Sequence, residues 1–136
     1  MEALVDMKPR LYYAHSKAIY DQPDEMLELR RIKKHYPGYT VVNPNGMFKS
    51  DGEWTTWLET GIQSMELVVF TSYLGFVGKG VYDELYEARR LGKDIVYLTK
   101  KGRFVTNYRL GRINPRLWKW YCRVWYIEGK PRTEKR

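Results

Sequence analysis

The sequence is poor in the residues that bind structural metals. It contains one cysteine, Cys122, and two histidines, His15 and His35. A single cysteine excludes a disulfide within the chain and a cysteine-rich zinc site, and two histidines so far apart make a poor ligand set. We therefore expect no metal. Asparagine and glutamine are also scarce, whereas lysine, arginine, glutamate and tyrosine are abundant, a composition that favours a heat-adapted (thermophile) source.

Long apolar runs are missing as well. No segment approaches the roughly 20 apolar residues that a membrane span needs, and the first residues hold no apolar stretch long enough for a signal peptide. We therefore expect a cytoplasmic protein. The chain has no internal repeat and no low-complexity linker, and 136 residues is the size of one domain. We expect a single domain over residues 1–136, with a frayed tail at 128–136.

Basic residues are concentrated at one end of the chain, and the formal net charge is +8. Residues 1–99 carry 12 basic and 14 acidic side chains, a net charge of −2, whereas residues 100–136 carry 12 basic and 2 acidic side chains, a net charge of +10. This asymmetry indicates an anionic partner for the last quarter, either nucleic acid or a phosphorylated small molecule. A solvated basic surface that only keeps the protein soluble is the alternative.

Apolar runs typical of buried strands alternate with helical patterns. The predicted strands cover residues 10–14, 39–42, 67–70 and 94–98. The predicted helices begin at the N-cap Asp21, at Ser50, which has capping-box spacing to Glu53, and at Val81, and Gly92 closes the last of them. The apolar stripe of the first helix is predicted to consist of Met26, Leu29, Ile32 and Tyr36. A fifth strand near an edge of the sheet is predicted at 117–127.

This order of elements predicts an α/β protein: one doubly wound, Rossmann-like (flavodoxin-like) domain with about five mostly parallel strands and helices on both faces. In such a sheet the ligand binds beyond the carboxyl ends of the strands, where the strand order reverses. The loops at residues 14–20, 43–48 and 71–84 are therefore expected to form the binding site.

The third of these loops is rich in glycine. Gly75, Gly78 and Gly80 lead from a buried strand into a helix whose first turn holds Asp83 and Glu84. Backbone N–H groups and the positive helix end can approach an anion such as phosphate in a loop of this kind. The order of the glycines fits neither the dinucleotide-binding fingerprint nor the P-loop, so we expect no cofactor.

Three segments together resemble the nucleoside 2-deoxyribosyltransferase superfamily. They are Val68-Val-Phe70, then Gly80-Val-Tyr-Asp-Glu-Leu-Tyr-Glu-Ala88, then Leu91-Gly-Lys-Asp-Ile-Val-Tyr-Leu98. The family reads Gly-Thr-x-x-Glu-Leu/Ile-Gly-x-Ala after its central strand, followed by a Gly-Lys pair and an apolar strand. Leu11-Tyr-Tyr-Ala-His-Ser16 resembles its opening strand and substrate loop, and Val42-Asn-Pro44 resembles the end of its second strand. The likeness spans roughly residues 10 to 100, with Val81 in place of the family's threonine.

The resemblance implies chemistry on an N-glycosidic bond. The family's glutamate at the helix start attacks the anomeric carbon of a deoxyribose and displaces the base, and Glu84 occupies that position here. The superfamily also includes hydrolases of deoxynucleoside monophosphates, which implies a phosphate subsite. Family members assemble their sites between subunits, which favours a homodimer. The candidate substrate-binding residues are Tyr13, His15, Ser16, Asn43, Ser72, Gly78, Lys79, Gly80 and Asp83.

Three alternatives remain open. A glutamate in the first turn of a helix is also explained by its interaction with the helix dipole. If that is the only role of Glu84, the domain is catalytically inactive. Arg116, Lys119 and Arg123 interleave with aromatic residues, a pattern typical of proteins that bind nucleic acid by phosphate contacts and base stacking. The same aromatic segment fits a dimer interface. Trp54 and Trp57, at helical spacing, are expected in the core and not against a ligand.

Overall fold

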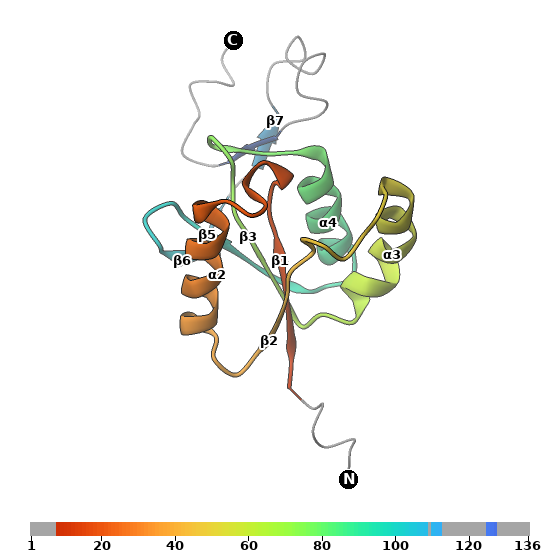
Figure 1. Ribbon diagram of the computed structural model, residues 1–136, viewed down its shortest axis with the longest axis horizontal. Coiled ribbons are helices and arrows are strands. Elements are labelled where there is room, and N and C mark those ends of the chain that lie inside the picture. Colours follow the sequence, from red (N-terminus) through yellow and green to blue (C-terminus); the bar gives the residue numbers. More distant parts are fainter. Residues whose placement is uncertain (1–7, 109, 113–124, 128–136) are drawn as a thin grey trace.

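The structure is a computed structural model that describes residues 8–108, 110–112 and 125–127 (Figure 1). Its elements are, in chain order, β1 (Arg10–Ala14), η1 (Lys17–Ile19), α2 (Pro23–His35), β2 (Thr40–Val42), α3 (Asp51–Gln63), β3 (Leu67–Phe70), β4 (Phe76–Val77), α4 (Lys79–Arg90), β5 (Asp94–Leu98), β6 (Phe104–Val105), β7 (Leu110–Arg112) and β8 (Trp125–Ile127). In the described part of the chain, no helix has the length and apolar character needed to cross a membrane.

The main sheet confirms an α/β fold with a mostly parallel sheet. Its five strands follow the order β2-β1-β3-β5-β6, and all but β6 run parallel. The predicted strands at 10–14, 67–70 and 94–98 coincide with β1, β3 and β5, and β2 begins one residue after its predicted start.

The prediction that residues 117–127 add a fifth strand to this sheet is wrong for the part that the structure describes, residues 125–127. The edge beside β5 is taken by β6, which pairs antiparallel with it. The chain reverses directly after β5, because Thr99 N–H donates to the carbonyl of Arg103 and Gly102 adopts a φ of 88°. Of the predicted segment 117–127, only β8 is described, and it pairs with β4 and β7 in a separate sheet.

Alternate residues of the central strands face two different helix layers (Figure 1). Tyr12 and Val68 pack toward α3 and α4, where they meet Ile62 and Leu85. Their neighbours Leu11, Tyr13 and Val69 pack on the other face with Ile32 of α2. Because successive strand side chains point to opposite faces, the adjacent Tyr12 and Tyr13 belong to different cores, a difference that decides their roles at the site.

The first helix departs from its predicted pattern. The N-cap is Gln22, not Asp21, which instead adopts a φ of 64°, and Pro23 is the first helical residue. Met26 is 62% exposed, contrary to its predicted place in the apolar stripe. The buried face of α2 carries Glu25, Glu28 and Ile32. The two carboxylates lie inward because they accept hydrogen bonds from buried groups of β1 and of the loop that follows it.

The second helix begins as predicted. The Ser50 side chain accepts a hydrogen bond from Glu53 N–H at 3.2 Å, and the Glu53 carboxylate accepts from Lys49 N–H at 3.0 Å. These two bonds satisfy N–H groups that have no partner within a helix. They also fix the start of α3 beside the carboxyl end of β1, which brings Trp54 toward the loops of the sheet.

The absence of a side chain at Gly61 leaves room for the indole of Trp57 in the same helix. A methyl group at Gly61 would meet the Trp57 ring at 1.9 Å, and that ring packs against Tyr12 and Phe48 with centroids 5.2 Å apart in each case. We expect Gly61→Ala to lower the free energy of unfolding by about 1–3 kcal/mol, because the indole must leave its packed position. Urea denaturation measures the loss. Gly52→Ala, where a methyl meets nothing closer than 3.6 Å, is the matched control, and equal stability of the two variants would contradict the prediction.

Candidate functional site

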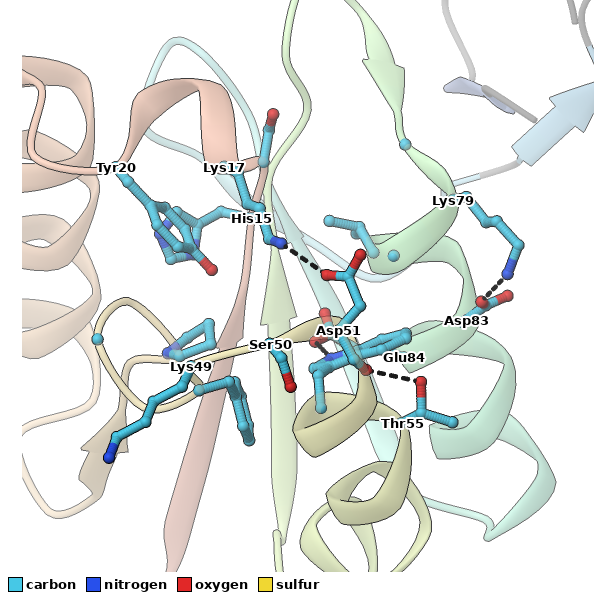
Figure 2. Close-up of a pocket in the computed structure, with 18 residues that line it drawn as sticks. His15, Lys17, Tyr20, Lys49, Ser50, Asp51, Thr55, Lys79, Asp83 and Glu84 are labelled. Carbon is cyan, nitrogen blue, oxygen red and sulfur yellow. Dashed lines mark hydrogen bonds and ion pairs between the residues drawn. The ribbon is translucent and has the colours of Figure 1, made fainter. Parts of the chain in front are cut away.

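A cavity of about 710 Å³ opens at the carboxyl ends of the parallel strands (Figure 2). Its walls come from the loop that contains η1, from residues 44–51 and from the start of α4 at residues 78–84. These segments fall mostly within the three loops that the sheet topology predicted. The first turns of α3, with Ser50, Trp54 and Thr55, complete the wall.

Glu84 is the buried acid of this cavity. Its side chain is on the inner face of α4 with Val81, Leu85 and Ala88, and the residue is only 5% exposed. One carboxylate oxygen, Oε2, accepts a hydrogen bond from the Tyr12 hydroxyl at 2.5 Å and another from Trp54 Nε1 at 2.8 Å. The same oxygen is therefore held by one donor from β1 and one donor from α3.

The other oxygen of Glu84, Oε1, faces the cavity. It accepts no hydrogen bond from the residues that the structure describes. Within the same residues, the one fully buried side-chain polar atom without a partner is Thr71 Oγ1, so Oε1 retains access to the cavity space. A carboxylate held in this way has one constrained oxygen and one oxygen free to react or to bind.

Burial raises the pKa of Glu84 to about 7. In this net value burial outweighs the hydrogen bonds from Tyr12 and Trp54, which lower the pKa because they stabilise the ionised carboxylate. The smaller effects of Asp83, which raises the pKa, and of Lys17, which lowers it, are also included. The pKa of Tyr12 rises far above its ordinary range through burial and the charge of Glu84. Tyr12 therefore stays protonated and acts as a donor. A shift of this size at a cavity is typical of functional carboxylates.

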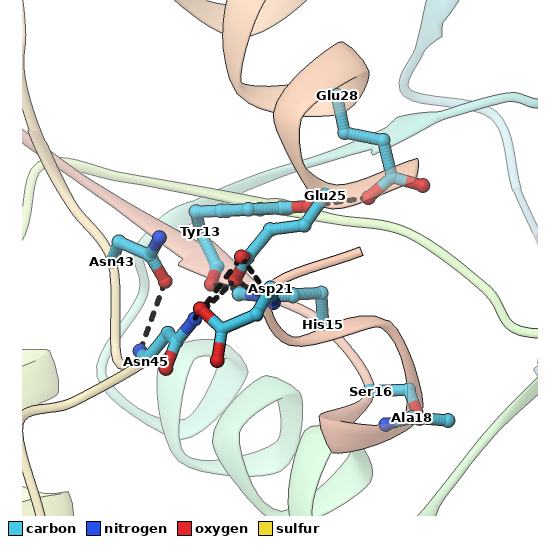
Figure 3. A network of polar contacts seen from close by, with 9 residues as sticks. All are labelled: Tyr13, His15, Ser16, Ala18, Asp21, Glu25, Glu28, Asn43 and Asn45. Carbon is cyan, nitrogen blue, oxygen red and sulfur yellow. Dashed lines mark hydrogen bonds and ion pairs between the residues drawn. The ribbon is translucent and has the colours of Figure 1, made fainter. Parts of the chain in front are cut away.

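A second buried network lies on the α2 side of the sheet (Figure 3). Tyr13 donates to Glu28 Oε1 at 2.5 Å. This bond resembles the one between Tyr12 and Glu84 on the opposite face of the sheet. The His15 ring stacks on the Tyr13 ring with centroids 3.7 Å apart, and its Nε2 lies 2.7 Å from Glu25 Oε2. Burial acts to raise the pKa of Glu25, but hydrogen bonds from Asp21 N–H, His15 and Asn45 lower it below its ordinary value.

Most of the predicted site residues line the cavity. Besides Glu84, these are His15, Ser16, Gly78, Lys79, Gly80 and Asp83. Tyr13, Asn43 and Ser72 do not. Tyr13 is fully buried on the other face, Asn43 Oδ1 accepts from Asn45 N–H at 2.9 Å, and the Ser72 hydroxyl bonds to the Tyr97 hydroxyl at 3.0 Å.

Sequence reasoning missed Trp54 as a group of the site. Both Trp54 and Trp57 were expected in the core. Trp57 does pack against the core residue Tyr12, but Trp54 lines the cavity and donates to Glu84. The capping box at Ser50 is the signal that points to this role, because it places Trp54 in the first turns of a helix that starts at the carboxyl edge of the sheet. Tyr20 and Phe48 are further aromatic residues of the wall that were not singled out.

The charged groups at the mouth are mostly paired. Lys79 bonds to Asp83 at 2.5 Å, and Lys17 bonds to Asp51 at 3.2 Å (Figure 2). Lys49 also lines the cavity. Within the described residues, no cluster of His, Cys, Asp or Glu has the arrangement of a metal site. The mouth thus presents lysines that an anionic ligand can engage.

The predicted nucleic-acid contacts Arg116, Lys119 and Arg123 lie outside the described residues. Neither a scan against protein-family models nor a search of curated proteins found a match for this chain. What the cavity can do chemically follows from its own groups. They are a buried carboxylate with one oxygen that accepts no bond from the described residues, aromatic walls and a mouth that carries lysines.

Proposed function

We propose that the protein cleaves or transfers the N-glycosidic bond of deoxynucleosides or their 5′-monophosphates, with Glu84 as the nucleophile. The observation that carries this proposal is the hydrogen bonding of Glu84, a residue that lines the cavity: two donors hold Oε2, and no described residue donates to Oε1. The resemblance to the nucleoside 2-deoxyribosyltransferase superfamily, with Glu84 at the family's nucleophile position, supports it. So does the location at the carboxyl edge, where a Rossmann-like (flavodoxin-like) domain binds its ligands.

The proposed reaction has two steps. In the first, Oε1 of ionised Glu84 forms a bond to the anomeric carbon, and the carbon–nitrogen bond to the base breaks. The electron pair of that bond leaves with the base, which takes up a proton from water. In the second, water or an N–H group of another base attacks the same carbon and gives up a proton to the solvent, which balances the proton taken up in the first step. The carbon–oxygen bond to Glu84 breaks and releases the carboxylate, as in retaining glycosidases.

The surroundings of Glu84 suit this chemistry. The transition state carries positive charge at the anomeric carbon, and a carboxylate stabilises that charge more strongly in a water-poor site than in bulk water. The bonds from Tyr12 and Trp54 keep part of the carboxylate population ionised against the effect of burial. They also fix its orientation, which leaves Oε1 as the attacking atom.

The rest of the cavity matches a nucleoside in kind. Tyr20, Phe48 and Trp54 offer aromatic rings to a planar base, and Lys49 and Lys79 at the mouth suit a 5′-phosphate. The proposal makes the protein a cytoplasmic enzyme of nucleoside or nucleotide metabolism, and its family resemblance makes a homodimer the expected assembly. It calls for no cofactor.

Base release tests the proposal. The purified protein is incubated with deoxynucleosides and with their 5′-monophosphates, each with and without a second free base, and the products are separated by chromatography. Release of free base identifies a hydrolase, and exchange of one base for the other identifies a transferase. Absence of both reactions for every substrate would overturn the proposed function and favour a binding role for the basic C-terminal quarter.

Tyr12→Phe is expected to change the pH dependence of this reaction. The rate of the native protein should fall with acid through the pKa of about 7 of Glu84, because only the ionised carboxylate attacks. Loss of the Tyr12 hydroxyl removes a bond that lowers this pKa, so the acidic limb moves to higher pH and the rate at neutral pH falls about tenfold. Rates measured across the pH range show the shift.

Tyr13→Phe is the matched control for this prediction. It removes the Tyr13 hydroxyl, which faces the other side of β1 and donates to another buried glutamate, Glu28. It should reduce stability and leave the acidic limb in place. An equal shift in both variants would mean that the limb reports general loosening of β1 and not the ionisation of Glu84.

A further inference from the structure

Tyr20 differs from the other buried tyrosines of β1 and its loop. Tyr12 and Tyr13 both donate to carboxylates, whereas the Tyr20 hydroxyl makes no hydrogen bond with the residues that the structure describes, although the residue is half-buried and lines the cavity. A half-buried hydroxyl that lines a cavity is accessible to what fills the cavity. It is a group that a ligand in the cavity can satisfy.

The backbone next to Tyr20 is held by a dedicated network (Figure 3). The neighbouring Asp21 adopts a φ of 64°, and its N–H donates to Glu25 Oε1 at 2.9 Å. Asn45 Nδ2 contacts both Asp21 Oδ1 and Glu25 Oε1 at 3.0 Å. A left-handed residue outside glycine persists only where its surroundings impose it. These contacts therefore determine where the chain presents Tyr20.

The ring of Tyr20 is supported as well. It lies 4.9 Å from the His15 ring, centroid to centroid, at 47° (Figure 2). His15 is fixed in turn, because it stacks on Tyr13, its Nδ1 lies 3.0 Å from the Tyr13 carbonyl and its Nε2 is bound to Glu25. Supporting contacts of this kind hold a binding residue in one geometry before the ligand arrives.

Tyr20 also lies close enough to Glu84 for their charges to interact. Burial, together with the charges of Glu84 and Glu25, raises the pKa of Tyr20 to about 12. Tyr20 also contributes to the raised pKa of Tyr12, which donates to Glu84. Tyr20 and Glu84 both line the cavity, and Tyr12 lies buried behind Glu84. The hydroxyl of Tyr20 keeps its proton at physiological pH and serves as a hydrogen-bond donor.

We infer that Tyr20 is a substrate-binding residue whose hydroxyl donates a hydrogen bond to an oxygen of the sugar held against Glu84. The inference rests on the proposed function, because Glu84 must lie beneath the anomeric carbon if it is the nucleophile. The sugar is then the part of the substrate nearest to both side chains. Tyr20 remains protonated throughout and takes no part in proton transfer.

The test separates binding from chemistry. In Tyr20→Phe the ring and its contact with His15 remain, and only the hydroxyl is lost. We expect KM for the deoxynucleoside that the native protein turns over fastest to rise about tenfold, the value of one hydrogen bond, while kcat and its acidic limb stay unchanged. Tyr86→Phe, on the outer face of α4 at 58% exposure, is the control and should change neither.

A separate measurement of binding distinguishes failure of the inference on Tyr20 from failure of the proposed function. Calorimetric titration of the same deoxynucleoside panel into the native protein, Tyr20→Phe and Glu84→Gln measures affinity directly. Turnover by the native protein with the same KM in Tyr20→Phe would overturn the inference alone. Binding that weakens about tenfold in Tyr20→Phe, with no turnover by any variant, would overturn the proposed chemistry alone. Neither binding nor turnover would overturn both.

Discussion

Replacing Glu84 with glutamine is expected to reduce base release on the order of 10³-fold or more, because the amide cannot form the covalent bond to the anomeric carbon. Glutamine has nearly the same shape, and its carbonyl oxygen can still accept from Tyr12 and Trp54, the two donors to Oε2. The fold and the walls of the cavity should therefore persist. Chromatographic assay of release, with circular dichroism to verify folding, measures the loss.

Glu28→Gln is the matched control for this loss. Glu28 is also buried, and it accepts a 2.5 Å bond from a tyrosine of β1, but it lies on the α2 side of the sheet. The exchange has the same chemistry and a similar structural consequence, at a place away from the cavity. We expect base release to persist in this variant. A similar loss in both variants would show that the activity depends on the β1 tyrosine–glutamate pairs as structure, and would remove the case for Glu84 as nucleophile.

The second prediction concerns stability. Folding raises the pKa of Glu84 from 4.5 to about 7. Below the lower value, both the folded and the unfolded chain hold the proton, and Glu84 contributes no pH dependence. Between the two values, the unfolded chain releases the proton more readily, so rising pH favours unfolding. Above about pH 7 the full penalty is present, which corresponds to about 3 kcal/mol of unfolding free energy.

Glu84→Gln should remove this penalty. We expect the variant to match the native protein at about pH 4 and to be more stable at about pH 8, by up to about 3 kcal/mol. Urea denaturation at both values measures the difference. Other groups, including Glu25 with its lowered pKa, titrate in both proteins, so the difference between them isolates Glu84. A native protein that is the more stable one at about pH 8 would mean that ionised Glu84 serves the fold and not a reaction.

Lower base release and higher stability of Glu84→Gln would together mean that Glu84 destabilises the fold and is needed for the reaction. A carboxylate whose burial is unfavourable persists only if the folded protein gains something else from it. Loss of base release together with a gain in stability at alkaline pH is the expected signature. A buried glutamate without a part in the reaction would show the gain in stability but no loss of base release.

Much of the fold was predictable because local patterns and tertiary packing agree. The continuous apolar run at 67–70 became the central strand, and the spacing of Ser50 and Glu53 became a working cap. The edge of the sheet was not predictable in the same way. The chain reverses at Gly102 directly after β5, and whether a short strand pairs back at such a turn depends on its neighbours as much as on its own residues.

The first helix shows why apolar spacing alone assigned the wrong residues to a buried face. Met26 fits an apolar stripe by spacing but is exposed, whereas Glu25 and Glu28 are buried. Their burial depends on donors from β1 and the following loop, Tyr13 and His15, which are distant in sequence from the helix face that they contact. A pattern of apolar residues does not register such partners, because it treats every buried carboxylate as unfavourable.

The sequence by itself determined the alternation of the four parallel strands with three helices and the loops that meet at the carboxyl edge, because these depend on local spacing. It placed Glu84 in the first turn of its helix, which is wrong, because α4 begins at Lys79 and its first turn holds no acidic residue. The tertiary structure alone decided which of two adjacent tyrosines serves the site. Strand geometry requires Tyr12 and Tyr13 to face opposite ways, but only the packing of α3 and α4 on one face places Glu84 and Trp54 against Tyr12. Which helices cover which face depends on contacts between distant segments.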